Sequence, residues 1–267
     1  MEAVTGKAMN AEPAISIKGL SLSFEQDGRR TDVLRGLDLD IARGEFVAIV
    51  GSSGVGKSTL LRVLMKLARP TEGAVSINPD PAAHTALALV FQDARLLPWR
   101  RVLANVAFGL EKVSATRAER RERALAALKL VGLDALADRW PHQLSGGQRQ
   151  RVALARALAV DPSILLMDEP FSALDVATRE NLQDELIRIR AQTGKTILFV
   201  THDIDEAVYL ADKVVALGGK PGEVRAVRTI AEAHPRNRRS LQLAEIAQAV
   251  KAEITAEAAA ARDDWVI

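Results

Sequence analysis

Two glycine-rich stretches of this chain have the composition of phosphate-binding loops. The first reads Gly51-Ser52-Ser53-Gly54-Val55-Gly56-Lys57-Ser58 and matches the pattern G-x-x-x-x-G-K-S. The second reads Leu144-Ser145-Gly146-Gly147-Gln148. One subunit rarely needs two cradles for one set of phosphates. We therefore expect the first stretch to bind a nucleoside triphosphate, and the second to contact the nucleotide held by another copy of the chain.

The first stretch lies between an apolar run at residues 46–50 and a helical pattern at 58–67, which is the context this motif requires. Its glycines allow backbone N–H groups to turn toward phosphates, and the helix N-terminus adds partial positive charge. We expect Lys57 to reach the β- and γ-phosphates, Ser58 to ligate Mg²⁺ and Thr59 to hold the α-phosphate. The alternative, an ordinary glycine-rich turn, does not account for this context.

Two adjacent acids follow the apolar run at residues 164–167. Carboxylates at the end of a buried strand are costly unless a cation or a nucleophile uses them. Asp168 is expected to hold Mg²⁺ through its water shell, and Glu169 to polarise the attacking water. The alternative is a strand end capped by exposed acids.

Two further polar residues follow predicted strands. Gln92 is expected to contact both Mg²⁺ and the attacking water, at the joint between the core and a helical insert. His202 follows the strand at 197–200, at the edge where ligands bind in such sheets, and is predicted to sense the γ-phosphate and to orient Glu169. A solvated loop glutamine and a structural histidine are the alternatives.

The second glycine-rich stretch offers the Ser145 hydroxyl, the unobstructed N–H groups of Gly146 and Gly147, and the positive end of the helix that follows, including Gln148. The alternative is a loop with serine as a helix N-cap, which explains one residue of the five.

The elements that position these residues follow from the apolar patterns. Residues 15–24 and 33–41 alternate around a turn at 26–28, which predicts antiparallel strands. Continuous apolar runs separated by helical patterns predict a parallel sheet covered on both faces, with strands at 46–50, 87–91, 164–167, 196–200 and 213–217. The fold class is therefore α/β.

About seventy residues between the strands at Leu87 and Ile164 are predicted to be helical throughout. Thr116 and Glu119 form a capping-box pattern that opens one helix, and another is expected at 148–159. We predict a domain at 14–235, with a helical subdomain inserted at about 94–158, and a tail at 236–267. The tail helix aligns Leu243, Ile246, Ala247, Val250 and Ile254.

Composition excludes several classes. The net charge of +2 and the 4% aromatic content do not indicate a nucleic-acid partner. With no cysteine, disulfides, thiolate metal sites and cysteine nucleophiles are excluded. The apolar runs are shorter than the roughly 20 residues of a spanning helix. Residues 1–13 lack a signal-peptide pattern, so we expect a loose terminus and a membrane role only through a partner.

Over nearly its whole length the chain resembles the nucleotide-binding subunit of ATP-binding cassette (ABC) transporters. The resemblance is carried by the P-loop, Gln92, the Leu-Ser-Gly-Gly-Gln signature, the acidic strand end, the stretch Ser172-Ala173-Leu174-Asp175 and His202, in the family's order. It implies an ATP hydrolase with a P-loop NTPase (RecA-like) core, an N-terminal antiparallel β subdomain and an inserted α-helical subdomain.

The resemblance also implies a homodimer that closes on two ATP molecules and reopens on hydrolysis. Residues 51–59 of one copy would face residues 145–148 of the other across a two-fold axis. Asp175 would link the two sites, and Phe24 looks like the aromatic that stacks on adenine. A phenylalanine that ends a strand is as often a core residue.

The segment Leu96-Leu97-Pro98-Trp99 lies where the family contacts the coupling helix of the membrane subunit. This sequence resembles the corresponding segment of the importers for nitrate, aliphatic sulfonates and taurine. This implies two transmembrane permease subunits docking here, an extracytoplasmic solute-binding protein, and a peripheral position on the cytoplasmic face of the inner membrane. The alternative for Trp99 is a packing residue of the helical insert.

Other functions stay open at this point. A P-loop kinase would share the first motif but has no use for the signature. A non-transport ABC ATPase, acting in translation or DNA repair, would share every motif, and an importer for another small solute, such as a pyrimidine precursor or riboflavin, would too.

Overall fold

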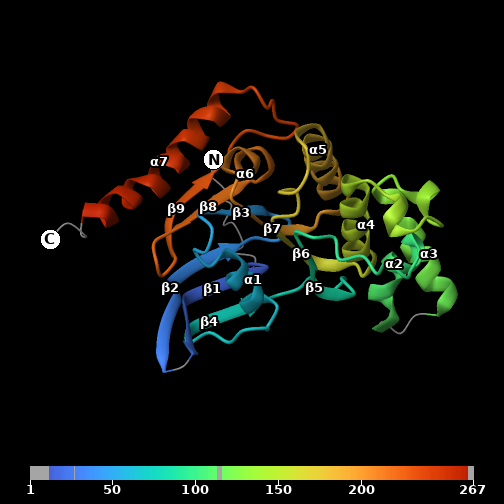
Figure 1. Ribbon diagram of the computed structural model, residues 1–267, viewed down its shortest axis with the longest axis horizontal. Helices are drawn as coiled ribbons and strands as arrows, with labels where there is room; N and C mark the ends of the chain where they lie inside the picture. The colour runs from blue at the N-terminus through green and yellow to red at the C-terminus, as the bar shows by residue number, and fades with distance from the viewer. Residues whose placement is uncertain (1–11, 27, 113–115, 264–267) are drawn as a thin grey trace, which may run out of the picture.

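The structure is a computed structural model of the 267-residue chain that describes residues 12–26, 28–112 and 116–263 (Figure 1). Residues 1–11 of the predicted loose terminus (1–13) lie outside the described residues, and so does Asp27 of the predicted turn.

Two sheets form the scaffold. The smaller has the order β2-β1-β4 and consists of β1 (Ile15–Gln26), β2 (Arg29–Ile41) and β4 (Glu72–Ile77).

The larger sheet has six strands in the order β5-β6-β7-β3-β8-β9. They are β3 (Phe46–Val50), β5 (Thr85–Val90), β6 (Pro162–Asp168), β7 (Thr196–Thr201), β8 (Lys213–Gly218) and β9 (Glu223–Thr229). The five predicted strands pair in parallel, which confirms that part of the prediction. Their carboxyl ends therefore meet at one edge, where ligands bind in such sheets.

Strands β4 and β9 were not predicted from the sequence. β4 pairs antiparallel with β1, and β9 pairs antiparallel with β8 at the edge of the larger sheet. The larger sheet is therefore mixed rather than wholly parallel. Both strands are largely exposed, so they lack the continuous apolar run by which the inner strands were found.

Helices cover the larger sheet and form an insert between β5 and β6 (Figure 1). The sheet is flanked by α1 (Lys57–Leu64), α5 (Val176–Thr193), α6 (Ile204–Leu210) and α7 (Leu241–Asp263). The insert holds α2 (Val102–Ala107), η1 (Phe108–Lys112), α3 (Arg117–Leu130), η2 (Asp134–Leu136), η3 (Pro141–Gln143) and α4 (Gly146–Ala159).

The predicted capping box at Thr116 is confirmed, since its hydroxyl accepts from the N–H of Glu119 and the carboxylate of Glu119 accepts from the N–H of Thr116. The prediction that the insert is helical throughout is wrong for residues 131–145, where two three-residue 3-10 helices lie between turns, and for residues 91–101, which form an irregular loop. In this loop the fully buried side-chain amide of Asn105 accepts from the N–H of Leu97 and donates to the carbonyls of Leu97, Arg100 and Arg101. These hydrogen bonds take the place of those that a helix would provide.

Two apolar clusters hold the layers together. One lies between the smaller sheet, α1 and one face of the larger sheet, and the other joins the opposite face to the insert, α5, α6 and α7. Leu243, Ala247 and Val250 of α7, which were predicted to align along a helix, are buried in the second cluster. Among the described helices, none is long and apolar enough to cross a membrane.

Candidate active site

The P-loop leaves β3 and ends at α1, in a conformation that requires glycine. Gly56 has a φ of 108°, and a Cβ on it would lie 2.4 Å from Cδ2 of Leu34. Lys57 begins α1, and its ammonium donates to the carbonyls of Gly51 (2.8 Å) and Ser52 (3.0 Å). The Lys57 side chain is only 5% exposed, and this burial lowers its pKa. The loop thus holds a positive charge against its own backbone.

Ser58 and Asp168 are 110 positions apart in the sequence and meet at the carboxyl edge of the sheet. The Ser58 hydroxyl donates to Oδ1 of Asp168 over 3.0 Å. Burial raises the pKa of Asp168, and the neighbouring charge of Glu169 acts in the same direction. A hydroxyl and a carboxylate are the hard oxygen donors that Mg²⁺ takes, usually together with waters and substrate phosphates. The residues therefore fit this ion.

Glu169 lies between a lysine and a histidine. Its Oε1 is 3.7 Å from Nζ of Lys57, and its Oε2 is 2.8 Å from Nδ1 of His202. Its φ of 44° is left-handed, which is uncommon for a residue with a side chain, and its N–H donates to the carbonyl of Val200 (2.9 Å). Backbone of this kind is enriched at functional sites, where neighbouring contacts hold it.

Gln92 lies at the same edge but does not contact the acidic side chains directly. Its Nε2 donates to the Ser172 hydroxyl (3.0 Å), which in turn donates to the backbone carbonyl of Glu169 (3.0 Å). A cavity of about 430 Å³ nearby is lined by residues that include Gln92, Asp168 and Gly146. The role of Ser172 as a link was not predicted, although its stretch was singled out.

The signature stretch forms the N-terminus of α4, which begins at Gly146, two residues earlier than predicted. Ser145 Oγ accepts from the N–H of Gln148 (3.2 Å), and the Gln148 side chain accepts from the N–H of Ser145 (3.0 Å). A Cβ on Gly147 would lie 2.4 Å from Cγ2 of Thr178, so that α4 and α5 pack closely there. Figure 1 shows α4 within the helical insert and apart from α1, so one chain does not bring the signature to its own P-loop.

Asp175 and Phe24 lie outside the cluster around Glu169. Asp175 caps α5 by accepting from the N–H of Thr178 (3.0 Å), and hydrogen bonds from this backbone lower its pKa. Phe24 lies in β1 and is 45% exposed, so it is a surface residue rather than a core residue.

The loop between β5 and α2 presents Trp99, which is 70% exposed and so is not a packing residue of the insert. Helix α4 holds the same loop, because Gln150 donates to the carbonyl of Phe91 (3.0 Å) and Arg156 donates to those of Ala94 and Arg95 (2.8 and 2.9 Å). The Gln92 loop and the signature helix are therefore tied to each other.

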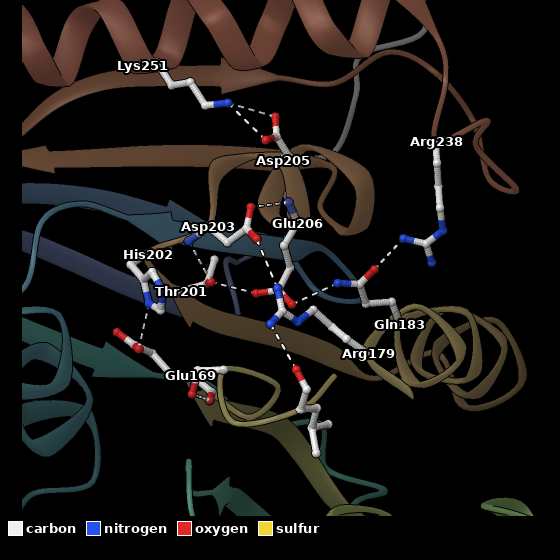
Figure 2. Close-up of polar contacts among 12 residues, drawn as sticks. Glu169, Arg179, Gln183, Thr201, His202, Asp203, Asp205, Glu206, Arg238 and Lys251 are labelled. Atoms are coloured by element: carbon white, nitrogen blue, oxygen red, sulfur yellow. Dashed lines mark hydrogen bonds and ion pairs between the residues drawn. The ribbon is translucent and has the colours of Figure 1, made fainter. Parts of the chain in front are cut away.

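A second polar network lies behind His202 and was missed in the sequence (Figure 2). It includes Thr201, Gln183 and Glu206, each less than a tenth exposed. The signal was weak, because a single acid or amide in a helix is usually solvated. Only the packing of α5 against α6 shows that these side chains are buried together.

Residues 34–172 match the family model described as ABC transporter. An aliphatic sulfonates import ATP-binding protein of Pseudomonas putida is 49% identical over 86% of this chain and 82% of its own. A taurine import ATP-binding protein of Pseudomonas aeruginosa is 46% identical over 79% and 81%. A solved dimeric ATP-binding cassette in a post-hydrolysis state, bound to ADP and Pi, has a TM-score of 0.69 at 36% identity, covering 82% of this chain and all of its own.

Proposed function

This chain belongs to the ABC transporter family, and we propose that it drives import of a small solute of the sulfonate or taurine class through ATP-driven closure of a homodimer. It is an ABC-type ATPase with a P-loop NTPase fold. The observation that carries the catalytic assignment is the arrangement of Lys57, Glu169 and His202 at one sheet edge. The solute class is supported by the names of the relatives.

In this proposal Glu169 is the general base. Its carboxylate accepts the proton of the attacking water, while His202 holds the other carboxylate oxygen and faces the γ-phosphate. Lys57 exchanges the loop carbonyls for phosphate oxygens and stabilises their negative charge. Ser58 and Asp168, with Gln92 nearby, would hold Mg²⁺, which neutralises charge on the phosphate oxygens when bound.

The signature completes the site of a second copy. The first N–H groups of α4 have no partner within the helix and form an anion site with the helix dipole. Ser145, Gly146 and Gly147 would contact the γ-phosphate held by the partner's P-loop, with Asp175 between the two sites and Phe24 against adenine. A related cassette is dimeric in two solved structures, which supports this arrangement.

The exposed segment around Trp99 is proposed to dock on two transmembrane permease subunits, which places the chain peripherally at the cytoplasmic face of the inner membrane. Because Gln150 and Arg156 tie this loop to α4, displacement of the signature helix would move the docking segment with it. An extracytoplasmic solute-binding protein would deliver the solute. The helical insert at about 94–158 then acts as one moving unit between nucleotide and permease.

The test combines genetics with reconstitution. Deleting the gene in its source organism should abolish growth on taurine or an alkanesulfonate as sulfur source, and the intact gene should restore it. The purified chain should hydrolyse Mg-ATP and co-purify with a multi-spanning membrane protein that stimulates this hydrolysis. Stimulation by ribosomes or DNA, with no membrane partner, would contradict the transport proposal and leave the ATPase intact.

A further inference from the structure

The C-terminal tail contacts α5 and α6, the two helices that follow the active-site strands β6 and β7. Arg236 is only 6% exposed, and its Nη1 donates to three carbonyls at the end of α6, those of Val208, Tyr209 and Ala211, over 2.9, 3.1 and 2.7 Å. A cation at a helix C-terminus is favourable because the last carbonyls lack intrahelical partners. This anchor places the next arginine of the tail over α5.

Arg238 extends from that anchor into the groove between α5 and α6 (Figure 2). Its guanidinium donates to Oε1 of Gln183, to the carboxylate of Asp184 and to the carbonyl of Glu180, and its Cζ lies 3.7 Å from the centre of the Tyr209 ring. The side chain of Arg238 is 28% exposed and that of Asp184 is 57% exposed, so their ion pair faces solvent. The contact with Gln183 is the partly buried one, because Gln183 itself is only 3% exposed. A cavity of about 310 Å³ next to it is lined by Gln183 and Glu206 among others.

From Gln183 a buried chain of hydrogen bonds runs toward the active site. Gln183 Nε2 donates to Oε1 of Glu206 (2.9 Å), and the Thr201 hydroxyl donates to Oε2 of Glu206 (2.6 Å). Thr201 Oγ1 also accepts from the N–H of Asp203 (3.0 Å). Thr201 and Asp203 are the two neighbours of His202, so the last link fixes the turn that carries the histidine.

The orientation of the Gln183 amide is set by its two partners together. The Arg238 guanidinium only donates and takes the carbonyl end, while the Glu206 carboxylate accepts from the NH₂ end. A buried polar network of this kind holds one geometry only while every member has its partner. Loss of the outer arginine would remove one of the two partners that orient the Gln183 amide and would loosen the hydrogen bond from this amide to Glu206.

Arg179 of α5 connects the loop before α5 to the turn that carries His202. Arg179 donates from Nη2 to the carbonyl of Leu174 (3.1 Å), and its Nη1 lies 3.5 Å from the Asp203 carboxylate. The turn with His202 and the stretch that ends at Asp175 are therefore both fixed to α5. The tail contacts α5 through Arg238 from the opposite side of this network (Figure 2).

We propose that Arg238 is a positioning residue for ATP hydrolysis, which acts through Gln183, Glu206 and Thr201 to hold the imidazole of His202 against Glu169. The inference rests on the catalytic roles proposed above for His202 and Glu169. It gives the C-terminal tail a part in catalysis, although the tail contributes no group that touches the nucleotide.

The first test compares Arg238→Met with Arg239→Met, which removes the same charge from an exposed neighbour. Arg238→Met should lower kcat by about tenfold, since misplacement of a catalytic group is costly, while the KM for ATP stays within about twofold. Arg239→Met should match the parent chain. Equal kcat values in Arg238→Met and Arg239→Met would overturn the inference. A parent chain without ATPase activity would instead contradict the proposed function.

The second test separates positioning from a general loss of stability. Thr201→Val removes the hydroxyl at the other end of the chain, and Thr201→Ser keeps it. The effects of Arg238→Met and Thr201→Val on kcat should be strongly non-additive, because both break one network, and Thr201→Ser should retain most of the activity. Additive effects would show that Arg238 acts elsewhere. If Arg238→Met does not fold, Gln183→Met interrupts the same chain with Arg238 intact and replaces it in both tests.

The third measurement observes the histidine itself. In ¹⁵N-labelled protein the imidazole signals of His202, assigned with His202→Asn, should shift in Arg238→Met. Those of His84, which pairs with Asp161 away from this network, should not. Unchanged His202 signals beside a lowered kcat would place the effect of Arg238 somewhere other than the imidazole and overturn the inference.

Discussion

Nδ1 of His202 lies 2.8 Å from Oε2 of Glu169, although the two residues are 33 positions apart in the chain. They follow β6 and β7, which are neighbours in the parallel sheet, with Asp168 paired to Val200. Sheet pairing therefore brings the proposed base and its orienting partner together. The histidine is 58% exposed and the glutamate 22%, so the pair faces outward from the sheet edge, toward where a nucleotide would bind.

Replacing Glu169 with glutamine should remove the proposed general base while preserving the shape of the side chain. We expect kcat to fall by roughly 10²- to 10⁴-fold, with ATP still bound and a stable ATP-dependent dimer formed. Phosphate release and size-exclusion chromatography measure the two effects. Glu72→Gln, on an exposed strand, is the control for the charge change. Undiminished hydrolysis in Glu169→Gln would remove Glu169 from its assigned role.

The Ser58 and Asp168 pair predicts a requirement for a divalent cation. Chelation with EDTA should abolish hydrolysis, and added Mg²⁺ should restore it, since hydroxyl and carboxylate oxygens are its ligands. Ser58→Ala should raise the Mg²⁺ concentration needed for half-maximal rate. Titration of Mg²⁺ at fixed ATP measures this shift. Full activity in EDTA, or an unchanged Mg²⁺ requirement in Ser58→Ala, would contradict the assignment.

The two signature glycines should respond differently to alanine. Gly147→Ala places a methyl group 2.4 Å from Cγ2 of Thr178 and should destabilise the chain by about 1–3 kcal/mol. At Gly146 the nearest atom is 3.5 Å away, so Gly146→Ala should keep its stability while weakening the ATP-dependent dimer. Denaturant unfolding and sedimentation measure these effects.

Thr178→Ser removes the methyl group that would clash with an alanine at position 147. It should therefore restore most of the stability lost in Gly147→Ala, if steric overlap is the cause. Failure of this second substitution to rescue the first would point to a backbone effect instead.

Burial of Glu206 predicts a pH-dependent stability. Desolvation raises its pKa above the ordinary value of 4.5, despite the hydrogen bonds from Thr201 and Gln183. The folded state then binds the proton more tightly than the unfolded chain, so this contribution to stability is complete at low pH and is lost as the pH rises through the folded pKa. The stability of the parent chain relative to Glu206→Gln should decline as the pH rises above the ordinary glutamate pKa of 4.5. A difference in stability that does not change with pH would contradict the shift.

Trp99 should be required for docking and not for folding. Because it is 70% exposed, Trp99→Ala should leave the unfolding midpoint nearly unchanged, while co-purification with the membrane partner falls severalfold. Phe108→Ala removes another exposed aromatic, 43% accessible, outside the proposed docking segment, and serves as the control. Equal co-purification of both variants would place the docking surface elsewhere.

Much of this protein follows from local patterns. The glycine and lysine spacing of the P-loop, the apolar runs of the inner strands and the capping box at Thr116 each depend on a few neighbouring residues, so periodicity and motif were sufficient. The family resemblance is confirmed by the comparisons. Edge strands β4 and β9 were not predicted, because exposed strands do not carry a continuous apolar run.

What depends on long-range contact was decided only by the tertiary structure. The loop at 91–101 stays irregular because the amide of Asn105 satisfies its backbone, and no local signal shows that this amide is buried. Likewise, Gln183, Glu206 and Arg238 look like ordinary solvated residues until α5, α6 and the tail pack together. Side-chain burial and partner choice arise from elements far apart in sequence, so the support behind His202 is a property of the fold.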